Sequence, residues 1–336
     1  QISGLIAMNN QIETSKKALV LGAGGFIGSH MVTFLKKNNY WVKAADLKYP
    51  SFSNSNADEF IIGDLKSRNF CKNLFIDDKK NESIIFDEIY QFAADMGGAG
   101  YLHTGDNDAN VVHNSALINL NIVDLSVKNK AKKVFYSSSA CVYGVEDCKE
   151  ERAYPANPDG EYGWEKLFSE RLYFTYNRNH NLDVRVARLH NIFGPKGSWN
   201  DGREKAPAAI CRKVAMSDDV VEVWGDGKQT RSFLYIDECI QGIRNLMDSN
   251  FSGPVNIGSE EMVSINEFVE KVISISNKKH LKIKNIDGPQ GIRGRNSNNE
   301  LIFKKLGWKP SLPLEGGLRK TYQWITEQIK ESDESI

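Results

Sequence analysis

The chain has 336 residues, of which 40% are hydrophobic, so it is long enough for about two domains with a sizeable buried core. Acidic and basic residues are equal in number, 43 of each, and give a formal net charge of +0. This balance excludes a general electrostatic attraction to nucleic acid or to an anionic membrane. Any phosphate group must therefore be bound by a local cluster of residues.

Five cysteines are scattered along the chain, and none of them forms a C-x-x-C motif. This odd, scattered set argues against a disulfide framework and a zinc site, and favours a reducing compartment. No apolar run approaches the roughly 20 residues that span a bilayer. Residues 1–17 lack the basic and apolar blocks of a signal peptide. We expect a cytoplasmic protein with no metal site, in which residues 1–17 are an N-terminal extension or a remnant outside the fold.

Short apolar runs alternate with helical patterns along the first half of the chain. The run at 18–21 predicts a buried strand, and apolar residues at helical spacing predict a helix over 26–38. Further strands are expected at 41–46, 60–62, 89–92 and 134–137, with helical segments between and after them that include 106–128 and 161–179. This alternation is typical of an α/β protein with a doubly wound parallel sheet of the Rossmann type.

Past Leu189 the pattern becomes irregular, because glycine and proline interrupt short helices and strands. We expect a Rossmann domain over 18–190 and a smaller, mixed α/β, substrate-binding region over 191–330. The segments 233–237 and 255–257 look like strands, so part of the stretch from about 233 to 258 is expected to return to the first sheet. The acidic end, 331–336, is expected to be a frayed tail.

Gly22, Gly25 and Gly28 form a G-x-x-G-x-x-G fingerprint directly after the first predicted strand. Glycine is needed there for a tight turn, for the approach of backbone N–H groups to a pyrophosphate, and for packing of the helix on the strand. Asp46 ends the next strand, where it could bind the adenosine ribose hydroxyls and repel a 2′-phosphate, so NAD is favoured over NADP. Asp64 could bind the adenine amino group or cap the next helix.

Tyr162 and Lys166 are four residues apart, so they share one face of a predicted helix. In a nicotinamide enzyme Tyr162 would deprotonate a sugar hydroxyl that Ser139 holds, with Lys166 and the nicotinamide lowering the pKa of the phenol from about 10. Cys141 follows Ser139 by two residues and suggests a second, separate proton transfer. From the sequence alone, a single cysteine after a strand is more often an inert, packed residue.

These motifs resemble those of the extended short-chain dehydrogenase/reductase superfamily that acts on nucleotide sugars, and more specifically those of the GDP-mannose 3,5-epimerase family. The resemblance extends from about residue 18 to residue 329. The segments that carry it are 93–98, 138–141, 190–191, 202–208, 224–227, 229–233, 236–239, 255–259 and 293–297.

The resemblance implies an NAD-dependent isomerase that inverts C3 and C5 of GDP-mannose through a transient 4-keto sugar, giving GDP-L-galactose, with GDP-L-gulose as the 5-epimer. Cys141 and Lys205 would abstract and return the protons, and the ammonium of Lys205 could lower the thiol pKa from about 8.5. The implied NAD site contains Gly22, Gly25, Phe26, Ile27, Gly28, Asp46, Asp64, Ala93, Tyr162 and Lys166. The implied substrate site contains Gly98, Ser139, Asn191, Glu204, Lys205, Ala206, Lys213, Gln229, Arg231 and Arg295. Arg203 and Arg293 are open between substrate binding and surface ion pairs.

The resemblance also implies a homodimer, because helices at 106–128 and 161–179 commonly form a four-helix interface in such proteins. Two alternatives stay open. The stretch between Cys141 and Tyr162 is shorter than in the plant-type pattern and Leu21 replaces a threonine, which leaves room for a related GDP-hexose or GDP-heptose 4-dehydrogenase, 5-epimerase or 4-epimerase. A protein of another class, a non-catalytic NAD-binding sensor or assembly protein, would bind the cofactor without turning over a sugar.

Overall fold

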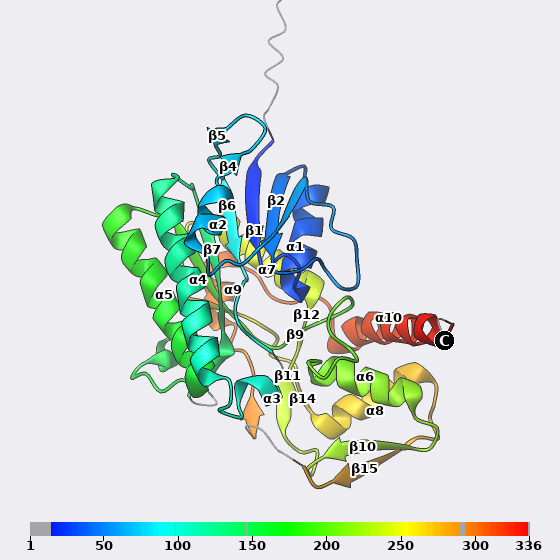
Figure 1. Cartoon of the computed structure of the whole chain (residues 1–336). Coiled ribbons are helices and arrows are strands. Elements are labelled where there is room, and N and C mark those ends of the chain that lie inside the picture. The colour runs from blue at the N-terminus through cyan, green and yellow to red at the C-terminus, as the bar shows by residue number, and fades with distance from the viewer. Residues whose placement is uncertain (1–14, 98, 145–146, 289–292, 335–336) are drawn as a thin grey trace, which may run out of the picture.

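The structure is a computed structural model that describes residues 15–97, 99–144, 147–288 and 293–334 (Figure 1). Most of the expected N-terminal extension, residues 1–14, lies outside the described residues. Among the described residues, no helix combines the length and the apolar character needed to cross a bilayer.

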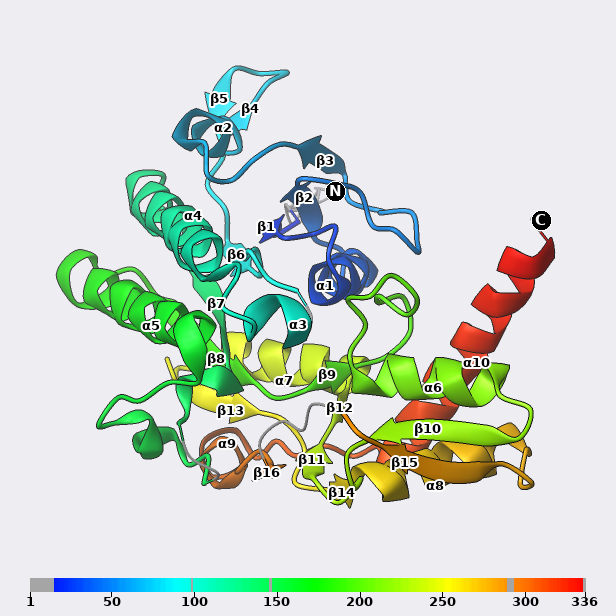
Figure 2. The ribbon, with the colours of Figure 1, turned by 60° about the horizontal axis from the view of Figure 1, so that its bottom comes forward.

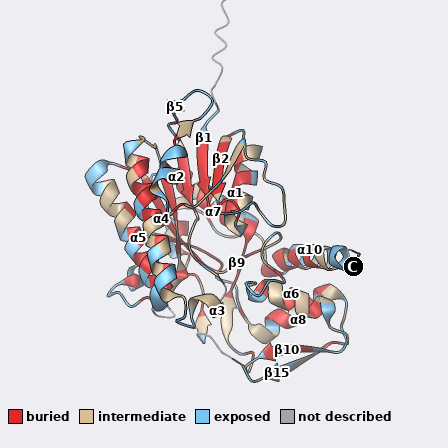
Figure 3. Ribbon diagram, in the orientation of Figure 1, coloured by how far each residue is buried: buried red, intermediate tan, exposed pale blue. Residues whose placement is uncertain are grey.

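Seven parallel strands form the central sheet, in the order β13-β8-β7-β6-β1-β2-β3. They are β1 (Lys17–Leu21), β2 (Trp41–Asp46), β3 (Glu59–Ile62), β6 (Glu88–Gln91), β7 (Val134–Ser139), β8 (Val184–Leu189) and β13 (Val255–Ile257). The central strands are buried along most of their length because helices cover both faces of the sheet (Figure 3). The predicted Rossmann-type sheet is confirmed, and each strand predicted from residues 18–137 lies within two residues of its expected bounds.

Two groups of helices cover the sheet, each with its own apolar core. The first group is α1 (Phe26–Lys37) and α7 (Ile236–Asp248), which contact each other. The second group is α2 (Arg68–Asn73), α4 (Asp108–Lys128) and α5 (Gly160–His180). Helices α4 and α5 run side by side along one edge of the molecule (Figures 1 and 2). Short elements between these are β4 (Ile76–Asp77), β5 (Glu82–Ser83), α3 (Ala99–Leu102), η1 (Ala140–Val142) and η2 (Glu150–Ala153).

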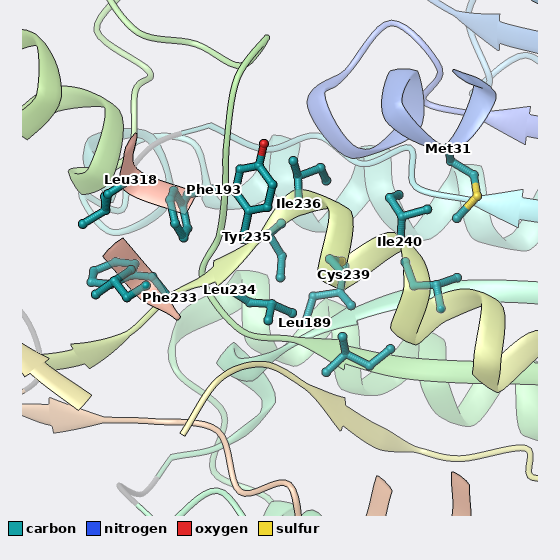
Figure 4. Packing of buried hydrophobic residues seen from close by; sticks show 14 of the residues in the cluster. Met31, Leu189, Phe193, Phe233, Leu234, Tyr235, Ile236, Cys239, Ile240 and Leu318 are labelled. Atoms are coloured by element: carbon teal, nitrogen blue, oxygen red, sulfur yellow. The ribbon is translucent and has the colours of Figure 1, made fainter. Parts of the chain in front are cut away.

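The segment from 233 to 258 returns to the first domain, but not with the two strands predicted. β13 pairs with β8, as expected. At 233–237 the strand prediction is wrong: only β12 (Leu234–Tyr235) is extended, and it pairs with β9 (Ile192–Phe193) outside the central sheet. Ile236 already begins α7, because Ile236, Cys239 and Ile240 lie at helical spacing and bury one face toward α1 and β8 (Figure 4).

The second region is assembled from short elements. Its helices are α6 (Ala206–Met216), α8 (Ile265–Ser276), α9 (Glu300–Leu306) and α10 (Leu314–Glu334). β10 (Val220–Trp224) pairs with β15 (Lys282–Ile286), and β11 (Thr230–Ser232) lies between β14 (Met262–Ser264) and β16 (Gly294–Arg295). α10 packs on α6 and α8 and points away from the body at its end (Figure 2). It continues to Glu334, into the stretch expected to be a frayed tail.

Candidate active site

A cleft of about 330 Å³ lies at the carboxyl ends of the central strands. Strand order reverses between β1 and β6, which is the position where doubly wound sheets bind their ligands. One wall is the glycine turn with the first residues of α1, and another is the loop at 194–205. Ser139, Tyr162 and Lys166 line the same cleft, so the structure brings together the glycine fingerprint and the reactive residues predicted from the sequence.

The glycine turn has no room for side chains. Gly22 has a φ of +78°, and a Cβ there would lie 2.7 Å from the backbone nitrogen of Ala93. A Cβ on Gly28 would lie 2.1 Å from the carbonyl oxygen of Gly22. The turn therefore holds the N-terminus of α1 against the strand ends, where backbone N–H groups can approach a pyrophosphate. Phe26 and Ile27, which open α1, also line the cleft.

Asp46 ends β2 beside the glycine turn. Its two carboxylate oxygens accept the N–H groups of Gly24 at 2.8 Å and Leu47 at 2.6 Å. Burial raises the pKa of this carboxyl, against the effect of these hydrogen bonds. Asp64 accepts the N–H of Lys66 at 2.9 Å. Neither carboxyl lines the cleft as the structure outlines it, so their contacts with the adenosine remain predictions.

Ser139, Tyr162 and Lys166 meet at the end of β7 and the first two turns of α5. The Lys166 ammonium donates to the carbonyl of Ser137 at 2.9 Å and lies 5.5 Å from the centre of the Tyr162 ring. Burial raises the pKa of Tyr162, and the Ser139 hydroxyl acts to lower it. The lowering expected from Lys166 together with the nicotinamide stays a prediction, because it concerns the enzyme with its cofactor bound. Burial also lowers the pKa of Lys166.

Cys141 and Lys205 approach the same space from the two regions. Cys141 lies in η1, with its N–H 3.2 Å from the Ser139 hydroxyl, and Lys205 is the N-cap of α6 and is exposed within the cleft. Burial raises the pKa of the thiol, although Arg295 and Lys205 act to lower it. Lys205 thus has the predicted lowering effect on this pKa, but burial outweighs it. The surrounding protein lowers the pKa of Lys205. The pKa of the thiol and the pKa of the ammonium are therefore each shifted in the direction of the other.

Two arginines from distant segments lie side by side, because β11 and β16 pair Arg231 with Arg295. Burial and the charge of Arg295 lower the pKa of Arg231. Arg295 is buried, donates to the Tyr143 carbonyl at 3.3 Å and pairs with Asp159 at 3.4 Å, and its Nε has no partner among the described residues. Arg295 is buried and Arg231 half-buried, and two adjacent guanidinium groups with an unused donor are suited to binding an anion.

The remaining predicted substrate residues divide between the cleft and its surroundings. Asn191 lines the cleft and donates to the Ser232 carbonyl at 2.9 Å. Glu204 pairs with Arg212 at 2.8 Å and has one buried oxygen without a partner in the described part of the chain. The buried amide oxygen of Gln229 also lacks a partner there. Ala206 begins α6 with its side chain exposed.

Lys213 and Arg293 lie apart from the cleft. Lys213 lines a separate, shallow pocket of about 340 Å³, where its ammonium lies 5.6 Å from the Trp224 ring centre. Arg293 pairs with Asp226 at 3.0 Å on the surface, which decides for the surface alternative, whereas Arg203 lines the cleft. Gly98 lies outside the described residues.

The sequence did not point to Asp159 or Thr321. Asp159 directly precedes α5 and pairs with Arg295, so its place just before the Tyr162 helix was an available signal. Thr321 reaches the cleft from α10, and its hydroxyl donates to the Gly317 carbonyl at 2.8 Å. Only the packing of α10 brings it there, so no local pattern could have found it.

A family model described as "NAD dependent epimerase/dehydratase family" matches residues 18–258. This chain belongs to that family. The family's dependence on NAD, together with the glycine turn, confirms NAD as the cofactor.

Relatives within the family are similar over nearly the whole chain. A GDP-mannose 3,5-epimerase of Arabidopsis thaliana is 45% identical over 324 residues, which cover 94% of this chain and 83% of the relative. GDP-mannose 3,5-epimerase 1 of Oryza sativa subsp. indica is 44% identical over 320 residues, covering 93% of this chain and 82% of the relative. The resemblance stated from the motifs is thereby confirmed.

Solved structures share the fold. A UDP-glucose 4-epimerase from Thermotoga maritima, solved with UDP-glucose, has a TM-score of 0.81 at 23% identity and covers 93% of this chain and 99% of its own. A UDP-glucuronic acid 4-epimerase from Bacillus cereus, solved with UDP-glucuronic acid and NAD, has a TM-score of 0.78 at 25% identity, with coverages of 93% and 99%.

Proposed function

We propose that this protein is an NAD-dependent epimerase that inverts C3 and C5 of GDP-mannose through a transient ketone at sugar C4. The products would be GDP-L-galactose and, after inversion at C5 alone, GDP-L-gulose. The observation that carries the proposal is the presence of two proton-transfer sets at one cleft. Tyr162, Lys166 and Ser139 line the cleft with Lys205, and Cys141 lies directly behind Ser139, where the charge of Lys205 acts on its thiol. The relatives named GDP-mannose 3,5-epimerase support the choice of sugar nucleotide.

The glycine turn and the start of α1 fit a dinucleotide, because a side chain at Gly22 or Gly28 would close the approach to the helix N-terminus. Asp46 would accept hydrogen bonds from the ribose hydroxyls. NAD, when bound, supplies a reversible acceptor for the hydride of sugar C4.

Tyr162, Ser139 and Lys166 would handle the proton of the C4 hydroxyl. The Ser139 hydroxyl acts to lower the pKa of the Tyr162 phenol and lines the same cleft, so it can hold the sugar hydroxyl beside the phenol. Lys166 is fixed by the Ser137 carbonyl, so its charge faces the phenol at constant distance. Burial raises the pKa of Tyr162 in the protein alone, so the phenol would act as a base only where nearby positive charge, such as that of Lys166, favours the phenolate.

Cys141 and Lys205 would act on the neighbouring carbons. A ketone at C4 acidifies the hydrogens on C3 and C5, so a base on one side and an acid on the other can invert each centre. The raised pKa of the thiol and the lowered pKa of the ammonium make these two groups closer in basicity than a free cysteine and lysine. Proton transfer in both directions is therefore accessible to the pair, as a reversible epimerisation requires.

Arg231 and Arg295 would bind the diphosphate. Their side-by-side placement on β11 and β16 gives two cations at one point of the second region, and Arg295 also contributes to the charge around Cys141. A diphosphate bound there would compensate the mutual repulsion of the two guanidinium groups. The sugar attached to that diphosphate would then extend toward Cys141.

The test is incubation of the purified protein with GDP-mannose and NAD in D2O, followed by proton NMR of the recovered sugar nucleotides. Deuterium at C3 and C5 with new epimers supports the proposal. NADH accumulation without exchange would indicate a 4-dehydrogenase. Exchange at C5 alone would indicate a 5-epimerase, and absence of both reactions would contradict the choice of GDP-mannose.

We also propose a homodimer that forms through α4 and α5. Leu120, Trp164 and Phe168 are exposed by 43%, 45% and 48% on these two adjacent helices, and large apolar side chains gathered on one helix pair favour burial against a second copy. Light scattering should give twice the chain mass for the wild type and one chain mass for Trp164→Glu. Met216→Glu, which alters an exposed apolar side chain on α6, is the control and should stay dimeric.

A cytoplasmic location is a further proposal. Cys71, Cys211 and Cys239 are buried free thiols, and a reducing compartment suits such residues. Fractionation of cells that express the full-length protein should recover it with cytoplasmic markers, and recovery in a secreted or organelle fraction would contradict this location.

A further inference from the structure

The loop at residues 194–205, named here the cleft loop, carries Lys205 at its end. It starts directly after β9 and ends at the N-cap of α6. Gly194, Gly197 and Ser198 line the cleft opposite the start of α1. Asp201 braces the loop from within, because its two oxygens accept the Ser198 hydroxyl and the N–H of Arg203, each at 2.9 Å. These two hydrogen bonds hold residues 198–203 of the loop together.

His30 connects the cleft loop to α1. Its Nε2 lies 2.9 Å from the carbonyl oxygen of Pro195, across 165 residues of sequence. Since a carbonyl oxygen can only accept, Nε2 must carry the hydrogen and donate it. The Phe26 ring holds the imidazole in place by an edge contact, with ring centres 5.3 Å apart and an interplanar angle of 89°.

Phe26 makes a second contact with the cleft loop, close to the first. A Cβ on Gly197 would lie 3.2 Å from the Phe26 ring, so the absence of a side chain lets the loop backbone rest on the ring. His30 and Phe26 are one turn apart on α1, and together they hold both Pro195 and Gly197. The helix that faces the cofactor's pyrophosphate thus holds the loop that ends in Lys205.

The far end of the cleft loop is tied to the second region by the ion pair between Glu204 and Arg212 of α6, at 2.8 Å. The cleft loop is thus anchored at both ends, once on each region, and Lys205 directly follows the second anchor. We propose that His30 is a positioning residue for epimerisation: it fastens the cleft loop to α1 and thereby holds Lys205 opposite Cys141. This inference rests on the proposed function for the role of Lys205, whereas the fastening itself is independent of the substrate.

His30→Leu removes the donor and keeps an apolar side chain beside Phe26. We expect it to lower kcat for C3 and C5 inversion by at least about tenfold, because misplacement of a reacting group by an ångström carries a penalty of that order or more. The KM for GDP-mannose should change little, since Arg231 and Arg295 are remote from the contact. His30→Gln places an amide N–H near the position of Nε2 and should restore most of the activity.

The second readout needs no sugar nucleotide. Hydrogen–deuterium exchange should show the Arg203 amide, which donates to Asp201, protected in the wild type, and His30→Leu should speed its exchange by about tenfold as the loop opens locally. Thr33→Ala is the matched control: it alters an exposed residue on the same helix, whose hydroxyl donates to the carbonyl of Ser29 within that helix. Its exchange and its kcat should equal those of the wild type.

Gly197→Ala tests the same contact from the loop side, because its methyl group would press on the Phe26 ring. This variant replaces His30→Leu in the test if His30→Leu fails to fold. Faster loop exchange and lower kcat in a folded variant support the proposal. Exchange and kcat equal to those of Thr33→Ala overturn it. If the wild type does not turn over GDP-mannose, the proposed function fails, while unchanged loop exchange in the variants would separately overturn the fastening.

Discussion

The two regions of the molecule contribute to the site in different ways: the first is built on one parallel sheet, whereas the second is assembled from short elements. In the first region, one parallel sheet positions the glycine turn after β1, Ser139 at the end of β7, and Tyr162 on α5, which packs against β7. In the second region, strands of two to five residues bring Arg231 and Arg295 together from distant segments, and a loop delivers Lys205. The sheet therefore fixes Ser139, Tyr162 and Lys166, which act at sugar C4. The proton transfer at C3 and C5 needs Cys141 and Lys205 together, so it depends on contacts between the regions.

Tyr162→Phe should block oxidation at sugar C4. It should also block exchange at C3 and C5, because that exchange needs the C4 ketone. Loss of the phenolic proton carrier should lower both NADH formation and C3/C5 exchange by about 10²- to 10⁴-fold. Stopped-flow absorbance of NADH and D2O exchange would measure the two steps. Tyr49→Phe, at a tyrosine 59% exposed, should leave both unchanged. Exchange that survives Tyr162→Phe would contradict the dependence of the second step on the first.

Arg188→Met should reveal how strongly the first region depends on one buried ion pair. Arg188 on β8 contacts both oxygens of Glu170 on α5 at 2.8 Å, and both side chains are almost fully buried. Removing the cation leaves a buried, unpaired carboxylate, at a loss of about 3–5 kcal/mol in the free energy of unfolding.

Denaturant unfolding measures this loss. Lys132→Met, in the exposed pair with Asp87, should cost less than about 1 kcal/mol. Equal losses in the two variants would show that burial does not distinguish the pairs.

His190 should make the contact between the regions sensitive to acid. It follows β8, contacts Asn256 of β13 at 2.9 Å, and burial lowers its pKa to about 4. Because this value lies below the usual value of about 6.5, the unfolded chain binds the proton first. Stability should therefore fall as pH decreases from about 6.5 to 4, by up to about 3 kcal/mol. Thermal unfolding of His190→Gln should show a smaller fall over this range, and an equal fall would assign it to other groups.

The pH dependence of exchange should separate the two proton-transfer sets. Burial raises the thiol pKa of Cys141, so its thiolate form grows about tenfold per pH unit above neutrality. Exchange at C3 and C5 should rise along that slope until Lys205, with its lowered pKa, loses its proton. NADH formation by Cys141→Ala should not show the rise with pH that follows the Cys141 thiolate. Identical pH profiles for the two would contradict separate roles.

The first region was predictable because parallel strands are short apolar runs and the fingerprint glycines follow the first of them. β8 was the exception: Arg185 and Arg188 interrupt its apolar run, and their partners at Asp183 and Glu170 appear only in the fold. The strand predicted at 233–237 failed for a related reason. Ile236 is compatible with a strand or a helix. It begins a helix here because α7 packs its apolar face against α1 and β8.

The site was predictable in its residue types but not in its electrostatics. A sequence suggests that a lysine lowers the pKa of a tyrosine or a thiol, yet burial dominates at Tyr162 and Cys141. It also gives no sign that β11 and β16 align two arginines, or that His30 binds the carbonyl of Pro195. Such contacts join segments far apart in the chain, and no local spacing encodes them.

Cys141→Ala tests most directly whether the two proton-transfer sets, Tyr162 with Lys166 and Ser139 and Cys141 with Lys205, act in separate steps. The measurement is NADH formation and D2O exchange in this variant with GDP-mannose, beside Tyr162→Phe. The account predicts that Cys141→Ala still forms enzyme-bound NADH and loses exchange at C3 and C5, whereas Tyr162→Phe loses both. Loss of both reactions in Cys141→Ala, or exchange that persists without the thiol, would contradict it.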